Sequence, residues 1–401
     1  MIEMMMHVND RHFMLLDELC HLEQRIASFE SYGFGLLIER KNDSAVVTIV
    51  IGNHDGSSFQ FGPRHQLAAH EEIIAIQMNI HGALKIGAKI HFFLHILKFF
   101  TNFAANYTDL LMKRAYSKWC SVALIAAIYV LAGVCGWLFF DFLTDRSLVV
   151  HSLVALLCAD VLATIIVWAF GLLYENVSVY DPYWSVFPPV AFLMWAFYTG
   201  VWSLPVILLL VASWYWGWRL TRNWAITFKG IDYEDWRYTK YRSLHPALFH
   251  LINLFGLNMM PTLVVFSAML PGLKLFEVVS YQLSAVSFGI LIVGFIMCVG
   301  AATIQLIADK QSHDFRAAHP GEVCNVGLWK HGRHPNYFGE ILFWWGIWVM
   351  YAALNGFDWF ILGPIAMTAM FLGISVPLME NRQLANKPGY AEYRKHTRIL
   401  I

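Results

Sequence analysis

The sequence predicts an all-α, polytopic membrane helix bundle, and two observations support that prediction. Of the 401 residues, 58% are hydrophobic and only 14% are charged, whereas a soluble domain carries about 25% charged residues. From Cys120 onward, long apolar stretches alternate with polar loops, without the short alternating segments of a membrane β-barrel. We therefore expect about eight transmembrane helices, within a range of roughly seven to nine, preceded by a small N-terminal α+β extension.

The predicted spans each approach the ~20 residues that a helix needs to cross a bilayer. The third and fourth spans form one hairpin, because Ser203, Leu204 and Pro205 carry a turn signal between them. In chain order the spans are 120–140, 149–173, 187–203, 204–218, 249–270, 282–304, 338–355 and 358–379.

Basic residues are concentrated on one side of this topology. The loops on that side contain most of the lysines and arginines, whereas the opposite loops, 141–148 and 271–281, contain only Arg146 and Lys274. This asymmetry follows the positive-inside rule, so both termini are expected in the cytoplasm. The basic segments are 113–119, 175–185, 219–245, 309–339 and 380–401.

Charge balance and the placement of cysteines and histidines exclude several classes of partner and site. Lys+Arg and Asp+Glu are balanced at 28 each, which gives no case for a nucleic-acid partner. Residues Met1–Glu30 lack the apolar core of a cleaved signal peptide. The six cysteines include no C-x-x-C pair, and the histidines lack ligand-like spacing, so neither a disulfide framework nor a metal site is expected.

The N-terminal extension, residues 1–112, differs in character from the predicted membrane domain, residues 113–401. Its periodicity and turn residues predict a hairpin and two surface helices. In chain order these elements are an amphipathic helix at Met14–Phe29, a strand at Ala45–Ile51, a turn at Gly52–Gly56, a partner strand at Ser57–Phe61 and an interfacial helix at Ile86–Phe103.

Polar residues gather where two late spans meet the basic side. Gln305 and Asp309 lie one helical turn apart at the end of one span, and Asn336 and Glu340 do so at the start of the next. A carboxylate in such a position needs a partner or a ligand, because an unpaired charge in a membrane is costly. Several arginines follow, and a guanidinium can bind phosphate through two parallel hydrogen bonds. The combination suits a bisphosphate dinucleotide, although each basic residue taken alone could equally anchor a span at the lipid headgroups.

The same segments resemble the C-terminal domain of the steroid 5-alpha-reductase superfamily. The resemblance lies in Gly327-Leu328-Trp329, in Arg333–Glu340 and in the tail Tyr390–Thr397, while Asp181–Ser185 is similar to a mark of a less-characterised multi-pass branch. It implies an NADPH-dependent membrane reductase of an activated carbon–carbon double bond in a lipid or sterol-like enone. It also implies a location in the endoplasmic reticulum of a eukaryote or the inner membrane of a bacterium.

The resemblance further implies which residues hold NADPH. Gln305 stands where the reductases usually have asparagine, and Asp309 and Arg316 match their helix-end aspartate and following arginine. The phosphates are expected near Arg316, Arg333 and Arg382. The full set expected to bind the cofactor is Gln305, Asp309, Arg316, Arg333, His334, Asn336, Tyr337, Glu340, Arg382 and Tyr390.

By the same resemblance, a tyrosine–carboxylate pair from the early spans polarises the substrate carbonyl. The candidates here are Tyr183 and Asp181, with Tyr180 beside them. Glu340 is a further candidate catalytic residue. An aromatic belt at the membrane interface is the alternative interpretation of the tyrosines.

Two segments rich in aromatic and charged residues lie at the start of the predicted loop 219–245 and within it, namely Trp218–Trp224 and Asp232–Tyr238. We expect them either to cap the cofactor cavity as a lid or to rest on the lipid headgroups. Exposed ion pairs within this loop would contribute little to stability.

Two other functions compete with the reductase. Isoprenylcysteine-type methyltransferases share a similar layout and an Arg-His-Pro-x-Tyr-x-Gly motif, but they use S-adenosylmethionine and normally have adjacent glutamates where this sequence has Glu380-Asn381-Arg382. A cationic sulfonium cofactor does not need the arginines that a bisphosphate needs, which favours the reductase. A non-enzymatic sterol- or lipid-binding membrane protein is the third possibility. The expected partners of the reductase are the lipid bilayer and a hydrophobic small-molecule substrate.

Overall fold

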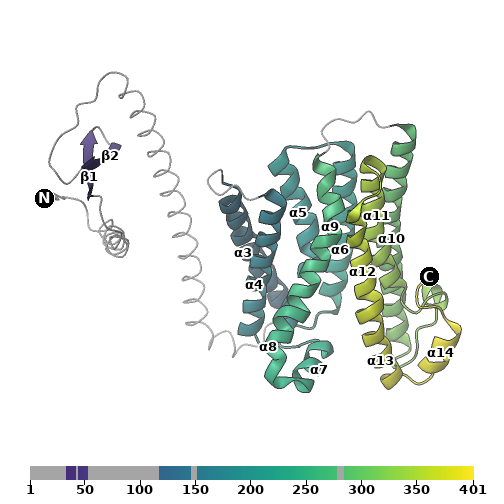
Figure 1. Ribbon diagram of the computed structural model, residues 1–401. Coiled ribbons are helices and arrows are strands. Elements are labelled where there is room, and N and C mark those ends of the chain that lie inside the picture. The colour runs from purple at the N-terminus through teal and green to yellow at the C-terminus, as the bar shows by residue number, and fades with distance from the viewer. Residues whose placement is uncertain (1–32, 42–43, 53–116, 146–150, 278–283) are drawn as a thin grey trace. The chain divides into compact units, whose positions relative to one another are not determined.

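The computed structural model describes residues 33–41, 44–52, 117–145, 151–277 and 284–401 (Figure 1). The chain divides into two compact units, residues 1–84 and 85–401. The predicted domain boundary between residues 112 and 113 lies outside the described residues, as do the helices expected at Met14–Phe29 and Ile86–Phe103.

The first unit contains an antiparallel hairpin of β1 (Gly33–Lys41) and β2 (Ser44–Gly52). The predicted strand Ala45–Ile51 is confirmed, since it lies within β2. β2 pairs with the preceding segment, β1, which was not predicted as a strand, and the predicted partner strand Ser57–Phe61 lies outside the described residues.

The residues between β1 and β2 carry a turn signal of their own. The register pairs Lys41 with Ser44 and leaves only Asn42 and Asp43 between them. Two-residue hairpin connections favour asparagine and aspartate, because these residues tolerate left-handed backbone conformations. A turn signal therefore precedes β2 as well as following it, and the earlier signal marks the hairpin.

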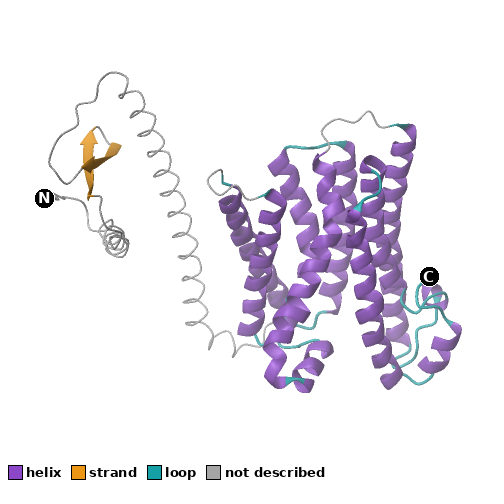
Figure 2. Cartoon of the chain, viewed as in Figure 1, coloured by secondary structure: helices purple, strands orange, loops and turns teal. Residues whose placement is uncertain are grey.

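The second unit is a bundle of long helices (Figure 2). Seven helical segments among the described residues have the length and apolar composition needed to cross a bilayer, which confirms the predicted multi-pass helical fold. The remaining predicted span corresponds to α5, a helix of 17 residues. The long helices are α3 (Lys118–Thr144), α4 (Ser152–Leu173), α5 (Tyr183–Thr199), α6 (Leu204–Thr227), α9 (Met260–Lys274), α10 (Ala285–Ala318), α11 (Pro335–Asn355), α12 (Leu362–Met370) and α13 (Val376–Asn386).

Shorter helices connect or extend these elements. Two of them have π-helical hydrogen bonding and lie inside longer helical segments, as π-bulges usually do. The shorter helices are η1 (Val177–Val179), α7 (Trp236–Leu244), η2 (Pro246–Leu248), α8 (Phe249–Leu251), the π-helix η3 (Ile252–Met259), η4 (Leu275–Glu277), η5 (Gly327–Lys330), η6 (Trp359–Ile361), the π-helix η7 (Phe371–Ser375) and α14 (Tyr390–His396).

The hairpin between α5 and α6 turns where the sequence predicts it. α5 ends at Thr199 and is capped by Gly200, whose φ of 69° lies in the left-handed region that glycine adopts without steric cost. α6 begins after Ser203 with Pro205 in its first turn, where the absent proline N–H leaves no hydrogen bond unmade. Gly200 thus terminates α5 and Pro205 initiates α6, which separates two apolar helices that would otherwise form one continuous apolar segment.

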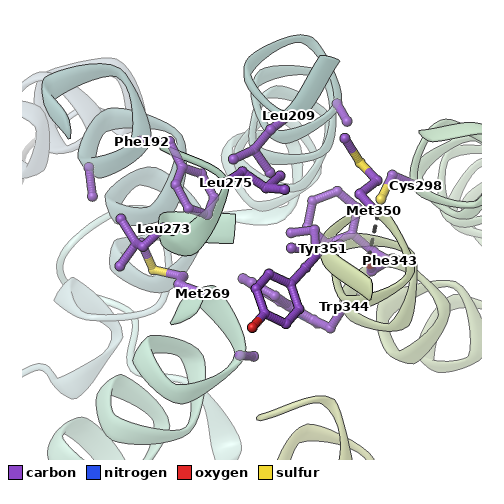
Figure 3. Packing of buried hydrophobic residues seen from close by; sticks show 14 of the residues in the cluster. Phe192, Leu209, Met269, Leu273, Leu275, Cys298, Phe343, Trp344, Met350 and Tyr351 are labelled. Atoms are coloured by element: carbon purple, nitrogen blue, oxygen red, sulfur yellow. Dashed lines mark hydrogen bonds between the residues drawn. The ribbon is translucent and has the colours of Figure 1, made fainter. Parts of the chain in front are cut away.

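The largest apolar cluster among the described residues joins α5, α6, α9, α10 and α11 (Figure 3). Trp216 of α6 is fully buried and stacks on Phe343 of α11, with ring centroids 4.7 Å apart. α10 and α11 approach so closely that a Cβ on Gly339 would lie 2.4 Å from Cγ of Gln305. This contact positions Gln305 beside the first turn of α11, where the predicted site residues begin.

α6 and α10 both continue beyond the ends of the predicted spans. α6 reaches Thr227 rather than residue 218, and α10 reaches Ala318 rather than residue 304. Arg219 of α6 is buried and ion-paired, so its charge is compensated inside the bundle. A boundary drawn from hydropathy stops at such a residue, because an unpaired charge would indeed have to leave the membrane. The segment Trp218–Trp224, predicted as loop, therefore belongs to α6.

Candidate functional site

α6, α10 and α13 finish at the same end of the bundle, next to α7 and α14 (Figure 1). A cavity of about 550 Å³ opens there, which we call the polar cavity; this volume lies within the range of about 300–1,000 Å³ typical of small-molecule sites. Eight of the ten predicted cofactor residues line it: Asp309, Arg316, Arg333, His334, Asn336, Tyr337, Arg382 and Tyr390. The remaining two, Gln305 and Glu340, are buried next to Asp309 and Asn336. Their role as cofactor ligands remains a prediction.

A buried ion-pair layer lies next to the polar cavity. Arg219 places Nη1 3.2 Å from Oδ2 of Asp309 and Nη2 3.3 Å from Oε2 of Glu340. The side chains of Arg219 and Glu340 are only 2% and 3% exposed, whereas Asp309 is 13% exposed and reaches the cavity. One guanidinium of α6 thus holds a carboxylate of α10 and a carboxylate of α11 in fixed positions.

Glu340 is fully engaged by hydrogen-bond donors. Besides Arg219, it accepts from Nε1 of Trp216 at 3.0 Å, from Nε1 of Trp344 at 3.1 Å and from Nε2 of Gln305 at 2.6 Å. Glu340 also does not line the polar cavity. The geometry therefore suits a role in positioning Arg219 and Gln305, while the catalytic role of Glu340 remains a prediction.

Arg333 holds the C-terminal tail. Its Nε donates to Oε1 of Glu380 at 2.7 Å, and its Nη1 donates to the carbonyl oxygens of Arg394, at 3.0 Å, and Thr397. Glu380 also pairs with Arg394 at 3.1 Å. Arg333 was predicted to bind phosphate, but these contacts occupy most of its donors, so an anchoring role accounts for its burial.

The polar cavity wall between α10, α11 and the tail carries neutral polar groups. The rings of His334 and Tyr337 stack with centroids 5.1 Å apart, and burial lowers the pKa of His334. Nδ2 of Asn336 donates to Oδ1 of Asp309 at 3.4 Å. Burial raises the pKa of Tyr390 to about 12, and its hydroxyl lacks a hydrogen-bond partner of ordinary geometry among the described residues. Such buried, unmatched polar atoms favour a site that is completed by a ligand.

Three basic side chains at the polar cavity, Arg316, Arg382 and Lys387, form no ion pair with a carboxylate of the described residues. The guanidinium of Arg382 lies 4.1 Å from the ring centroid of Trp236, the first residue of α7. Cation–π contact leaves the in-plane N–H groups of an arginine available to an anion. The segment Asp232–Tyr238 thus touches the cavity rim through Trp236, while its predicted role as a lid remains a prediction.

A second cavity, which we call the apolar cavity, has a volume of about 650 Å³ and is bounded by α3, α4, α5 and α6. Nearly all of its lining side chains are hydrophobic. Val130 and Val134 of α3 line it and are 67% and 48% exposed on the outer surface of the bundle. Since that surface is apolar, the cavity opens toward the side of the bundle that a bilayer would cover.

Tyr183 lines the apolar cavity and forms a tyrosine–carboxylate pair. Its hydroxyl donates to Oδ1 of Asp160 at 2.8 Å, and Asp160, in the middle of α4, is only 1% exposed. Tyr180 instead shares a hydrogen bond of 2.7 Å with Thr262. Both tyrosines are buried, so they contact protein and do not lie at the surface as a belt would.

Asp181, the predicted carboxylate partner of Tyr183, faces another way. It accepts hydrogen bonds from Tyr238 and, at 3.4 Å, from Nη2 of Arg237, both in α7. The structure therefore replaces the predicted Tyr183–Asp181 pair with Tyr183–Asp160, and Asp181 fastens α7 to the start of α5. Adjacent residues at a helix start point in different directions, which sequence proximity alone does not reveal.

Asp181 predicts a pH-dependent stability. Burial raises the pKa of Asp181 to about 6, although Arg237 opposes the shift. Because the folded pKa exceeds the usual value near 4, the stabilisation is complete below about pH 4 and is lost as pH rises through about 6. We expect Asp181→Asn, which cannot ionise, to flatten the fall in thermal stability across that window. The measurement is Tm in detergent between pH 4 and 7, and superimposable wild-type and variant profiles would contradict the assignment.

Sequence reasoning missed four residues of these sites: Asp160, Arg219, Glu380 and Lys387. Asp160 carried a usable signal, since it is the one carboxylate within the predicted span 149–173. Arg219 carried no such signal, because it directly follows the predicted span 204–218, where a basic residue is expected. Its importance depends on α6 continuing past it and on contacts with α10 and α11.

Residues 167–397 match the protein family described as "Protein of unknown function (DUF1295)". This match covers more than half of the chain. The chain belongs to that family. DUF1295 is part of the steroid 5-alpha-reductase-like superfamily. Searches of curated proteins and of solved structures gave no match.

Proposed function

We propose that this protein is an NADPH-dependent membrane reductase of an activated carbon–carbon double bond in a lipid or sterol-like enone. The observation that carries the proposal is the convergence of eight predicted cofactor residues on the polar cavity. A buried tyrosine–carboxylate pair at a separate apolar cavity supports the substrate side of the proposal.

The polar groups that line the polar cavity match a dinucleotide phosphate in charge and in hydrogen-bonding capacity. Asp309 and Asn336 at its inner end offer the carboxylate and amide that bind ribose hydroxyls or a carboxamide. Arg316, Arg382 and Lys387 offer cations without a carboxylate partner among the described residues. NADPH bound there would supply the hydride that reduces the double bond.

Tyr183 is our candidate for the group that polarises the substrate. Its hydroxyl would donate a hydrogen bond to the carbonyl oxygen of an enone, which draws electron density from the β-carbon. For the single hydroxyl proton to face the substrate, the buried Asp160 would be protonated and would itself donate to the Tyr183 oxygen, 2.8 Å from its Oδ1. The hydrophobic walls of the apolar cavity would hold the rest of the substrate and exclude water.

The proposal includes a movement of α6. Thr221 and Trp224 line the apolar cavity, whereas Asn223 and Thr227 line the polar cavity, and the two cavities share no lining residue. Reduction requires the reacting atoms to approach within about 3–3.5 Å. The last turns of α6, after Arg219, would therefore shift when both ligands are bound.

The methyltransferase is the weaker candidate on chemical grounds. Its sulfonium cofactor is a cation, and the polar cavity already holds three unneutralised cations. The glutamate that follows the last span, Glu380, is engaged by Arg333 and Arg394 and is not free to receive a sulfonium.

Equilibrium binding to the detergent-purified protein tests the proposal. We expect saturable binding of NADPH and none of S-adenosylmethionine. Because charge-assisted hydrogen bonds contribute about 1.5–3 kcal/mol each, Arg382→Ala should weaken NADPH binding by roughly tenfold or more. Lys395→Ala, an exposed lysine outside the polar cavity, is the matched control and should leave binding unchanged. Saturable binding of S-adenosylmethionine alone would reject the reductase.

A further inference from the structure

Reduction of the proposed enone consumes a proton at a buried pair of side chains. Hydride addition to the β-carbon leaves an enolate, whose oxygen would take the hydroxyl proton of Tyr183. The Tyr183 oxygen would then regain a proton from Asp160, 2.8 Å away. Asp160 is 1% exposed, so its carboxylate would be left ionised inside the bundle, where a charge is costly. Each further turnover therefore requires that a new proton reach this pair.

A series of side-chain hydroxyls, which we call the hydroxyl row, leads away from the pair. Thr164 follows Asp160 by one helical turn on α4 and is a hydrogen-bonding neighbour of the Tyr183 hydroxyl. Oγ1 of Thr164 lies 3.0 Å from Oγ1 of Thr262 on α9. Oγ1 of Thr262 in turn lies 2.7 Å from the hydroxyl of Tyr180. Thr164, Thr262 and Tyr180 therefore form a continuous chain of hydrogen-bonding distances that ends at Tyr183.

The hydroxyl row can carry a proton because a hydroxyl both donates and accepts hydrogen bonds. Thr262 donates to the carbonyl oxygen of Asn258 at 3.0 Å, and in that state it accepts from Thr164 and Tyr180. Rotation about the Cβ–Oγ1 bond turns the same hydrogen toward Thr164 instead. Thr164 then donates to Tyr183, and Tyr180 resupplies Thr262. Each transfer breaks one O–H bond and forms the next, with no change in oxidation state.

The hydroxyl row runs from the middle of the bundle toward the end that holds the polar cavity. Tyr180 lies just before α5, and the α5–α6 hairpin places the start of α5 at the same end as the last turn of α6. Asp181, the next residue, has a side chain that is 17% exposed. A carboxylate that water can reach therefore follows the outer end of the row, whereas the apolar cavity on the other side of Tyr183 is almost entirely hydrophobic.

The helix around Thr262 also indicates a functional region. Thr262 closely follows the π-helix η3, and π-bulges lie frequently at functional sites. Asn258 of η3 is 1% exposed, and its Oδ1 lacks a hydrogen-bond partner among the described residues. A buried acceptor of this kind, next to the hydroxyl row, favours a site that is completed by water.

We infer that Thr164, Thr262 and Tyr180 form a relay that returns a proton to Tyr183 and Asp160 after each turnover. This inference rests on the proposed function, because a relay is needed where a reduction consumes a proton. It separates the roles of the two tyrosines. Tyr183 donates to the substrate, and Tyr180 passes protons from the water-exposed end of the bundle.

The experiment separates the first turnover from later ones by rapid mixing of the detergent-purified full chain with NADPH and an enone. The enone is the sterol, polyprenoid or fatty enoyl compound that the wild type reduces. Thr262→Val removes one hydroxyl and keeps the shape of the side chain. The first turnover uses protons already on Tyr183 and Asp160, so its rate should stay within a few-fold of wild type. Steady-state turnover should fall roughly tenfold to a hundredfold, because proton transfer by a positioned group typically contributes about 10²–10⁴.

Other variants test the same separation. Tyr180→Phe should also slow the later turnovers and spare the first, and Thr262→Ser should restore most of the steady-state rate. Thr303→Val is the matched control, because Oγ1 of Thr303 likewise lies 3.1 Å from a tyrosine hydroxyl, that of Tyr215, and lines neither cavity. We expect its steady-state turnover to equal that of the wild type.

The outcomes separate this inference from the proposed function. Absence of NADPH oxidation by the wild type with every one of these enones would remove the proposed function itself. Unchanged steady-state turnover in Thr262→Val and Tyr180→Phe, with wild-type activity intact, would overturn the relay alone. Equal losses in the first and later turnovers would also overturn it, because the hydroxyls would then only hold Tyr183 in place. Size-exclusion profiles and Tm values show whether each variant is folded.

Discussion

Replacing Arg219 with methionine is expected to destabilise the protein more than any other single change considered for the bundle. Arg219 is 2% exposed and is the cation that pairs with both Asp309 and Glu340. Its removal leaves two carboxylates without that partner in a buried layer, and breaking a buried ion pair in this way costs about 3–5 kcal/mol. We expect a large fall in Tm of the detergent-purified protein and a loss of nucleotide binding.

Two further variants isolate the cause of that effect. Arg222→Met, three residues along α6 and exposed, should change Tm little. The triple variant Arg219→Met, Asp309→Asn, Glu340→Gln should recover part of the lost stability, because no unpaired charge remains buried. A loss of similar size for Arg219→Met and Arg222→Met would show that the buried layer is not an ion-pair network.

The second large effect is expected on turnover. Tyr183→Phe removes the hydroxyl that donates to Asp160 but keeps the ring packed at the apolar cavity. General acid assistance typically contributes a factor of about 10²–10⁴, so reduction of an active enone should fall by that amount. NADPH binding should not change, because Tyr183 does not line the polar cavity.

The natural control for Tyr183 is another tyrosine of the same apolar cavity. Tyr129 lines that cavity, and its hydroxyl donates to the backbone carbonyl of Val179. Tyr129→Phe should therefore leave turnover within a few-fold of wild type. The assay follows NADPH oxidation with sterol, polyprenoid and fatty enoyl enones, using whichever the wild type reduces. Full activity of Tyr183→Phe would exclude it as the polarising group.

Much of the fold could be predicted from the sequence because the bilayer imposes simple rules. Apolar length identified the spans, and Gly200 with Pro205 marked the α5–α6 hairpin. The spacing of Gln305 with Asp309 and of Asn336 with Glu340 also placed each pair on one face of its helix, and the structure brings the two pairs into contact. These patterns are local in the sequence, so they can be recognised without knowing how the helices pack.

The parts that could not be predicted depend on contacts between distant segments. Arg219 stays inside the bundle only because α10 and α11 supply its carboxylates. Asp160 meets Tyr183 from another helix, while the neighbouring Asp181 points to α7. Arg333 was predicted from the sequence to bind phosphate, but its guanidinium donates hydrogen bonds to Glu380 and to the C-terminal tail. In each case the partner is separated by many residues and leaves no spacing signature.

The most direct test of the central claim is native mass spectrometry of the detergent-purified protein incubated with NADPH and S-adenosylmethionine together. At an NADPH concentration near the wild-type Kd, we expect a mass increase equal to one NADPH, which is strongly reduced in Arg382→Ala and persists in Lys395→Ala. An increase equal to S-adenosylmethionine, or a wild-type mass that neither nucleotide changes, would contradict the assignment of the polar cavity to a dinucleotide phosphate.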